Sequence, residues 1–390
     1  MQHAKRMDQF QDGIFTVLAE IKNKRLAQGK PVYDFSVGTP NIPPAPHIMK
    51  AIVDAASDPK NYVYAISDLP EFQDAISGWY ERRYGVEVDP RTQVTSLLGS
   101  QEGLGHIALA FADEGDIVLV PDPCYPVFQD GPKIAGAKVV YMPMKKENDY
   151  LIQFDEIDEE VAKKAKMMIV SYPNNPTSVM APDWWYEELI KFAKKYDILV
   201  LHDNAYSELV YDGNTCGSFL RFEGAMDVGV EFNSLSKTYG VAGARIGICV
   251  GNPEMVKMVK KLKSNMDYGM FIPVQMGAIE AISNPDQSCV VNTRLAYQKR
   301  RDLVCEGFKE IGWDIPKCTS TMFLWAPIPE GYANSNEFAM ELVDKTGMLV
   351  APGSAFGPSG EGNVRLALVR NEEEIAAAIK ACKEAGVFNK

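Results

Sequence analysis

The sequence predicts an α/β protein: a large domain with a mostly parallel central sheet flanked by helices, plus a smaller α+β domain. Between residues 94 and 250, short apolar runs alternate with stretches of helical pattern. These runs are apolar throughout, which is typical of strands that are buried on both faces of a parallel sheet. The runs are VTSLL, DIVLV, MMIVSY, DILVL, VGVEF and IGICV.

The predicted helices and loops follow from turn residues and periodicity. Residues 11–29 have the pattern of an amphipathic helix that ends at Gly29 and Pro31, and the Pro/Gly loop SVGTPNIPPAP follows. Residues 101–113 and 183–196 are predicted helices that separate strands of the sheet.

A second unit is expected after Asn284-Pro285. It begins with a long charged helix and continues through TMFLWAPI, a further helix, MLVAPGSAFG and NVRLALV. The N-terminal segment is expected to join this unit. We therefore expect a large domain over residues 50–285 and a small domain formed by residues 1–49 and 286–390.

Composition excludes several classes of function. The 390 residues carry a net charge of -12, which argues against nucleic acid as the main partner, since phosphate binding needs a basic surface. The seven cysteines form no CxxC pair, as expected in a reducing cytoplasm. No apolar run approaches the length of a membrane span or a signal peptide, and the four histidines are widely spaced. We expect a cytoplasmic protein with no membrane partner and no metal site.

Chemically distinctive segments follow the predicted strands. They are GSQEG, PDPCYP, YPNNPTS, HDNAY and NSLSK. In parallel sheets, ligands bind beyond the carboxyl ends of the strands. The sequence therefore predicts that these segments meet at one ligand site.

Lys237 is the first candidate for chemistry. An arbitrary lysine is most often a solvated surface residue. Here NSLSK follows a buried strand and precedes GVAGARIG, which leaves little room for a solvated face. A desolvated amine has a lowered pKa and can form a Schiff base with a carbonyl compound.

Two further segments allow both a structural and a functional interpretation. Asp203 either caps a helix or points a carboxylate into the site, where it can keep a heteroaromatic nitrogen protonated; Tyr206 lies three residues on. Gly99 and Ser100 precede an apolar helix, so Ser100 is either a simple N-cap or part of an anion site at the helix N-terminus.

Two arginines have similar alternatives. Arg245 is either a structural ion-pair residue or, with Ser234 and Ser236, a phosphate clamp. Arg365 lies between apolar neighbours in NVRLALV, and its two-pronged guanidinium is suited to a carboxylate. YPNNPTS is by default an Asn-Pro turn, and aromatic residues such as Phe323 are expected to serve packing. No P-loop and no GxGxxG after a strand is present.

As a set, these motifs resemble those of the fold-type-I, pyridoxal-5′-phosphate (PLP)-dependent aminotransferases of the aspartate aminotransferase class. The resemblance extends from about Val32 to Ala385, and GVEFNSLSKTYGVAGARIGICVGN and KSNMDYGMFIPVQMGAIEA are most similar to the branch of LL-diaminopimelate aminotransferases. It implies transamination between an L-amino acid and a 2-oxo acid by a ping-pong mechanism. A C–S β-lyase is the nearest alternative, and a non-catalytic PLP-fold sensor is an alternative of another class.

The resemblance also implies a role for each motif residue. Lys237 would carry the cofactor, Asp203 would bind its pyridine nitrogen, and Arg365 would bind the substrate carboxylate near Gly38. The phosphate would be bound by Gly99, Ser100, Gln101, Ser234, Ser236 and Arg245. The remaining ring contacts would be Tyr125, which stacks on the ring, and Asn175 and Tyr206, which contact its phenolic oxygen. Tyr64 would reach the phosphate of the neighbouring subunit, which implies a homodimer with composite sites.

Some positions depart from the family pattern. The family commonly has glycine where this chain has Asp68, Cys124 and Ser178, and a bulky aromatic residue where it has Ala244. The spacing around Tyr64 is about one residue short, so that Tyr62 is a rival for its role. We expect all of these positions to border the cofactor or substrate.

Overall fold

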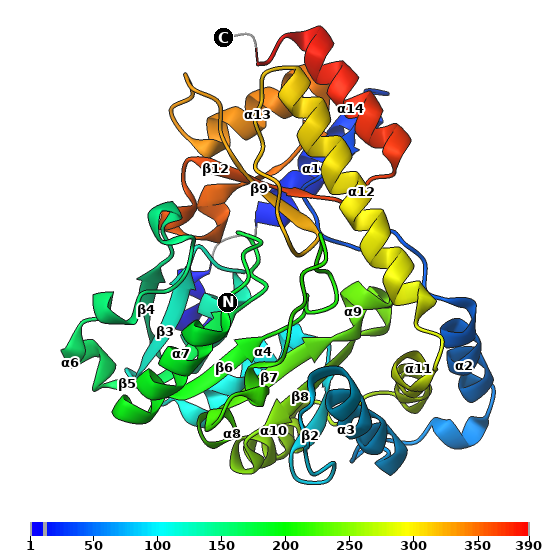
Figure 1. Cartoon of the computed structure of the whole chain (residues 1–390), viewed down its shortest axis with the longest axis vertical. Coiled ribbons are helices and arrows are strands. Elements are labelled where there is room, and N and C mark those ends of the chain that lie inside the picture. The colour runs from blue at the N-terminus through cyan, green and yellow to red at the C-terminus, as the bar shows by residue number, and fades with distance from the viewer. Residues whose placement is uncertain (1, 11–13, 389–390) are drawn as a thin grey trace.

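The six apolar runs and one further strand form a seven-stranded sheet in the computed structural model, which describes residues 2–10 and 14–388 (Figure 1). The strand order is β2-β8-β7-β6-β5-β3-β4. Pairs from β4 to β7 are parallel, whereas β8 runs antiparallel to both β7 and β2. The predicted, mostly parallel sheet is confirmed. The strands are β2 (Val94–Leu98), β3 (Ile117–Asp122), β4 (Lys138–Pro143), β5 (Ala165–Ser171), β6 (Leu199–Asp203), β7 (Gly229–Ser234) and β8 (Ile246–Gly251).

Helices cover both faces of this sheet, because successive side chains of a strand point to opposite faces. In β5, Met167 and Ile169 pack against α4, α5 and α10, whereas Met168 and Val170 pack against α3, α7 and α11. β4 is not predicted by the apolar pattern because it lies at the edge, where most of its side chains are only half-buried. The helices of this part are α2 (Pro46–Ala56), α3 (Pro70–Tyr84), α4 (Ser100–Phe111), α5 (Val127–Ala135), α6 (Glu159–Ala162), α7 (Asp183–Tyr196), α8 (Ala225–Val228), α9 (Leu235–Thr238), α10 (Pro253–Met266) and α11 (Ile272–Ser283).

The C-terminal third and the N-terminal segment pack together above the large sheet (Figure 1). Their strands form an antiparallel sheet in the order β11-β12-β9 and a parallel pair of β1 with β10. Figure 1 shows the long helix α12 running from the region of α9 to α14, and it contacts both. The elements are β1 (Tyr33–Asp34), β9 (Phe323–Pro327), β10 (Met348–Leu349), β11 (Ala351–Pro352), β12 (Asn363–Ala367), α1 (Ile14–Ala27), α12 (Ser288–Glu310), α13 (Ser335–Thr346) and α14 (Glu372–Ala385).

Two observed helices bear on the expected boundaries. The helix expected over residues 11–29 is present as α1, and residues 11–13 lie outside the described residues. α2 crosses the expected domain boundary at residues 49 and 50, and it packs against α11. No helix in the described part of the chain is both long enough and apolar enough to cross a membrane.

One edge of the large sheet collects the motifs. β2, β3, β5, β6 and β7 all end there, because they run in the same direction. β8 runs the opposite way, so it begins there: Ile246 pairs with Leu98, the last residue of β2. The segment before β8 therefore meets the segments that follow the other strands.

Candidate active site

A cavity of about 280 Å³ lies at this edge of the sheet. Its walls come from the segments that follow β2, β3, β5 and β6, from α9 and the turn before β8, and from β12 and the loop after β1. With the exception of Tyr64, all of the predicted site residues line it: Gly38, Gly99, Ser100, Gln101, Tyr125, Asn175, Asp203, Tyr206, Ser234, Ser236, Lys237, Arg245 and Arg365.

Lys237 lies in α9, the single helical turn directly after β7, and its amine reaches the cavity. Its Nζ donates a hydrogen bond of 2.7 Å to the carbonyl oxygen of Gly38. Burial, helped by the positive charges of Arg365 and Arg245, lowers the pKa of Lys237 to about 8. A far larger fraction of this amine than of an ordinary lysine is therefore unprotonated near neutral pH, as a nucleophile or a base must be.

Asp203 is the last residue of β6 and is only 6% exposed. Its Oδ1 accepts a hydrogen bond of 3.3 Å from the backbone N–H of Ala205. Burial raises the pKa of Asp203 to about 6, although the neighbouring His202 opposes the shift. The helix-cap interpretation of Asp203 is wrong, because residues 205–208 form turns and not a helix. A buried acid of this kind suits a ring N–H whose positive charge it would balance.

The opposite end of the cavity is suited to an anion. α4 begins at Ser100, so its unpaired backbone N–H groups and the positive end of its dipole lie beside Arg245. Gly99 has a φ of +74°, and a Cβ atom on it would lie 2.2 Å from Nη2 of Arg245. Ser100 is not the N-cap, since Gly99 holds that position. This donor set fits a phosphate group.

Arg245 is held in an uncommon backbone conformation beside two serines. Its φ of 57° and ψ of 56° are left-handed, and it follows the short turn η6 (Ala242–Ala244). Its guanidinium donates to the carbonyl oxygens of Ala242 and Leu98. Ser234 caps α9 by accepting a bond of 3.2 Å from the N–H of Ser236. Such backbone conformations persist where the surrounding structure fixes them, most often at functional sites.

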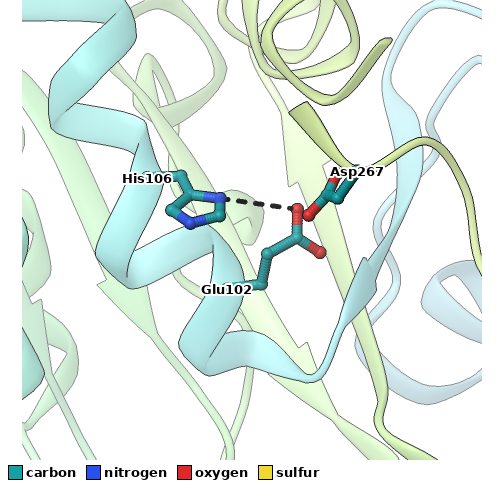
Figure 2. A group of neighbouring side chains, drawn as sticks. All are labelled: Glu102, His106 and Asp267. Carbon is teal, nitrogen blue, oxygen red and sulfur yellow. Dashed lines mark ion pairs between the residues drawn. The ribbon is translucent and has the colours of Figure 1, made fainter. Parts of the chain in front are cut away.

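A buried ion pair braces the start of α4. Glu102 accepts a bond of 2.5 Å from the N–H of Leu98, and its two oxygens accept bonds of 2.6 and 2.8 Å from Nζ of Lys263. His106 and Asp267 lie close to the same carboxylate (Figure 2). The geometry resembles a metal site, but the ammonium of Lys263 already neutralises Glu102. We therefore interpret the group as a structural support for the anion end of the cavity.

Arg365 lies on β12 and is 2% exposed, so the usual solvated position of a strand arginine does not apply. Its Nη1 donates to Oδ1 of Asn175 and its Nη2 donates to the carbonyl oxygen of Ser36, both at 2.9 Å. The guanidinium carbon lies 4.2 Å from the ring centre of Phe323 and 4.6 Å from that of Phe356. Burial lowers the pKa of Arg365 to about 10, so the group remains cationic at neutral pH.

The two cavity tyrosines keep their hydroxyl protons. Burial raises the pKa of both Tyr125 and Tyr206, with the charge of Asp203 adding to the effect. The hydroxyl of Tyr125 donates to Oε1 of Gln101 at 3.2 Å. Each tyrosine can therefore donate a hydrogen bond.

Tyr64 and its rival Tyr62 lie on the surface and not at the cavity of their own chain. Tyr64 is 81% exposed and packs against Tyr268, with ring centres 5.7 Å apart. Tyr62 is 64% exposed and donates to the carbonyl oxygen of Ala56. The role expected for Tyr64 in a neighbouring subunit stays a prediction.

The expectation that Asp68, Cys124, Ser178 and Ala244 border the cavity is wrong, because none is among its lining residues. Asp68 supports β2 instead, by accepting bonds from the N–H and the hydroxyl of Ser96. Cys124 is fully buried, and Ala244 packs against the hydrophobic core. Ser178 has a φ of 62°, a conformation that favours glycine.

Phe323 is a lining residue that the sequence analysis missed. Its ring borders the cavity, which contradicts the packing role expected for it. A Cβ atom on Gly38 would lie 2.6 Å from this ring, so any larger residue there would displace the ring. Val37, Thr39 and Ala242 also line the cavity without having been predicted. An apolar residue in an apolar strand carries no signal that separates a wall of a site from ordinary core.

Comparison with known proteins places the chain in a family. The profile of the family "Aminotransferase class I and II" matches residues 30–381. The LL-diaminopimelate aminotransferase of Halothermothrix orenii is 40% identical over 388 residues, covering 99% of each chain, and that of Dehalococcoides mccartyi is 41% identical over 380 residues, covering 97% of each.

Solved structures agree with this placement. BacF from Bacillus subtilis, in a substrate-bound structure, has a TM-score of 0.95 and 32% identity over 98% of each chain. A probable N-succinyldiaminopimelate aminotransferase from Thermus thermophilus has a TM-score of 0.90 and 35% identity, covering 96% of this chain and all of the other. The chain belongs to the class I and II aminotransferases and is an enzyme that moves an amino group between an amino acid and a 2-oxo acid.

Proposed function

We propose that the cavity binds pyridoxal 5′-phosphate and that Lys237 is the residue to which it attaches. One observation carries the proposal: a buried amine with a pKa of about 8 lies in the same cavity as an anion cradle and a buried acid. When bound, this cofactor supplies an aldehyde for the amine of the substrate and a ring that withdraws electrons from its Cα. Gly99, Ser100 and Arg245, with Gln101, Ser234 and Ser236, would hold the phosphate.

The residues around the ring would orient it and set its charge. Asp203 would hold a proton at the ring nitrogen, because the resulting ion pair relieves the cost of burying its carboxylate. Tyr206 can donate to the phenolic oxygen, as can the amide nitrogen of Asn175, whose oxygen accepts from Arg365. Tyr125 would pack against the ring face.

The substrate's groups would be divided between Arg365 and Lys237. Arg365 would bind the α-carboxylate, since a cationic guanidinium offers two parallel N–H donors. Lys237, once free, would take the proton from Cα as a general base and, as a general acid, would deliver it to the carbon that carried the cofactor's aldehyde. The first oxo acid would leave before the second one enters, while the amino group stays on the bound cofactor, so we expect ping-pong kinetics.

The covalent attachment can be tested without any activity measurement. The purified protein should absorb visible light when loaded with pyridoxal 5′-phosphate, and reduction with borohydride should add the cofactor's mass to the peptide that contains Lys237. Lys237→Ala should lose the covalent adduct and the turnover. Attachment to another lysine, or near-normal turnover of the variant, would refute the assignment.

We further propose that the amino donor belongs to the diaminopimelate class, with a second ammonium and carboxylate at its far end. The names of the relatives support this class. A panel of amino donors, including LL-diaminopimelate, L-aspartate and L-alanine, should be tested with 2-oxoglutarate and with pyruvate. Release of pyruvate from a sulfur-containing amino acid, without an added oxo acid, would instead favour the C–S β-lyase, which the comparisons do not favour.

We also propose a homodimer. Exposed apolar side chains gather in the segment that follows α2 and beside α11, among them Tyr62, Val63, Tyr64, Ile66 and Phe271. An exposed apolar patch of this kind is typical of an interaction surface. Light scattering should give twice the mass of 43.2 kDa. Dimers that combine a Lys237→Ala chain with a Tyr64→Ala chain should regain one intact site if Tyr64 acts across the interface.

A further inference from the structure

Two buried hydroxyl groups connect the loop after β5 to the segment before β9. Oγ of Ser178 and Oγ1 of Thr321 lie 2.6 Å apart, and the two residues are 2% and 0% exposed. Oγ of Ser178 donates to the carbonyl oxygen of Phe323 at 2.9 Å. Oγ1 of Thr321 accepts from the N–H of Phe323 at 3.1 Å. The hydroxyl pair therefore holds both polar groups of the Phe323 backbone in one closed ring of hydrogen bonds.

Both hydroxyl residues have left-handed backbone conformations. Ser178 has a φ of 62° and Thr321 a φ of 63°, a region that favours glycine and is least accessible to β-branched residues. Further bonds fix these conformations. The hydroxyl of Ser320 donates to the backbone carbonyl oxygen of Ser178, and the hydroxyl of Tyr211 donates to the backbone carbonyl oxygen of Thr321. Side chains with hydroxyls thus occupy two positions where the backbone alone favours glycine, and the hydrogen bonds that they form offset the strain.

The ring of Phe323 connects this hydroxyl pair to the cavity. It lies against Gly38, whose carbonyl oxygen accepts from Lys237. It also stacks beneath the guanidinium of Arg365, whose carbon lies 4.2 Å from the ring centre. A shift of the Phe323 backbone would therefore move the surface on which Arg365 rests.

We propose that Ser178 and Thr321 are positioning residues that fix Phe323 against Arg365 and thereby set the enzyme's affinity for the substrate carboxylate. This rests on the proposed function, in which Arg365 binds that carboxylate. A preorganised guanidinium binds with less loss of conformational freedom than a mobile one. The effect should fall on binding more than on proton transfer, because the ring of Phe323 contacts the guanidinium of Arg365 directly but reaches Lys237 only through Gly38.

Three variants of the holoenzyme test the proposal. Ser178→Gly removes one hydroxyl and also relieves the backbone strain, so the variant should fold. Thr321→Val removes the other hydroxyl with little change of shape, and Thr321→Ser is the matched control that keeps it. The amino donor should be the best one of the panel above, with 2-oxoglutarate as acceptor.

We expect Ser178→Gly and Thr321→Val to raise KM for both substrates about tenfold, as the loss of one or two neutral hydrogen bonds implies. The kcat value should change less than about threefold, the affinity for pyridoxal 5′-phosphate should be unchanged, and Thr321→Ser should have the KM of the original enzyme. An unchanged KM in a folded Ser178→Gly enzyme would overturn the proposal, as would a Thr321→Ser enzyme as impaired as Thr321→Val.

Arg365→Lys, measured alongside, separates this inference from the proposed function. If Arg365→Lys raises KM while the hydroxyl variants do not, only the positioning role fails. If Arg365→Lys also leaves KM unchanged, the carboxylate site itself is wrong and both proposals fail.

Discussion

Replacing Asp203 with Asn should stabilise the cofactor-free protein, even though it removes a residue that we assign to the cofactor. The pKa of Asp203 is about 6 in the folded protein, against an ordinary value of 3.8. The folded state thus holds this proton more tightly than the unfolded chain does. Stability is therefore lost as the pH rises from 3.8 through about 6.

The size of the effect follows from the two pKa values. They differ by about two, and each unit corresponds to about 1.36 kcal/mol, which gives a loss of about 3 kcal/mol that is complete by about pH 7. At pH 5 the same values give about half of this loss. Asparagine does not titrate, so the advantage of Asp203→Asn should increase between these two pH values. The native enzyme thus loses folding stability by burying the carboxylate of Asp203, as expected for a residue kept for function at the expense of stability.

Denaturant unfolding of both cofactor-free proteins, at one protein concentration and at several pH values between 5 and 8, measures this difference. Asp89→Asn is a control that should lose stability and not gain it. Asp89 is exposed, and hydrogen bonds from Thr92 and Arg91 stabilise its carboxylate and lower its pKa. Added pyridoxal 5′-phosphate should reduce the advantage of Asp203→Asn, since only the original carboxylate can balance a ring cation. A difference that is absent at pH 7, or equal at pH 5 and pH 7, would refute the reasoning.

Three further predictions concern other parts of the site. Gly99→Ala should weaken the binding of pyridoxal 5′-phosphate at least about tenfold in a fluorescence titration, because the added Cβ would lie 2.2 Å from Nη2 of Arg245. Gly115→Ala is the control: this glycine also has a positive φ but open space around it, so the affinity should be unchanged. Arg365→Lys should raise KM for amino acids about tenfold or more, with a smaller effect on kcat, since one of the two charge-assisted hydrogen bonds to the substrate carboxylate is lost. An unchanged KM in steady-state assays would contradict this prediction. Glu102→Gln should lower the free energy of unfolding by about 3 kcal/mol, since Lys263 would keep a buried charge with only the more distant carboxylate of Asp267, at 3.5 Å, to balance it. A smaller loss in Lys263→Met than in Glu102→Gln would support this cause, and a larger one would contradict it.

Local chemistry explains why so much of the site could be predicted. Lys237, Asp203 and Arg365 are charged residues within or directly beside apolar strands, and such residues are rarely buried unless they are paired or belong to a functional site. The rule that ligands bind beyond the carboxyl ends of parallel strands then predicts that they meet. The structure brings all three to one cavity.

The errors have equally local causes. Asp68 and Ser178 were expected at the cavity because they differ from a family pattern, yet the structure uses them to support β2 and to hold Phe323. A departure from a pattern indicates that a position is special, but not which group its side chain contacts. Phe323 was missed because its apolar neighbours make a wall residue and a core residue look alike.

By itself, the sequence determined the type of sheet, the order of the motifs and the residue types that chemistry requires, because these depend on periodicity and on charges near in the chain. Only the tertiary structure decided that β8 is antiparallel, which brings Arg245 to the edge where the other motifs lie. It alone also decided the burial that moves the pKa values of Lys237 and Asp203 toward neutrality, since desolvation depends on every element packed around a group.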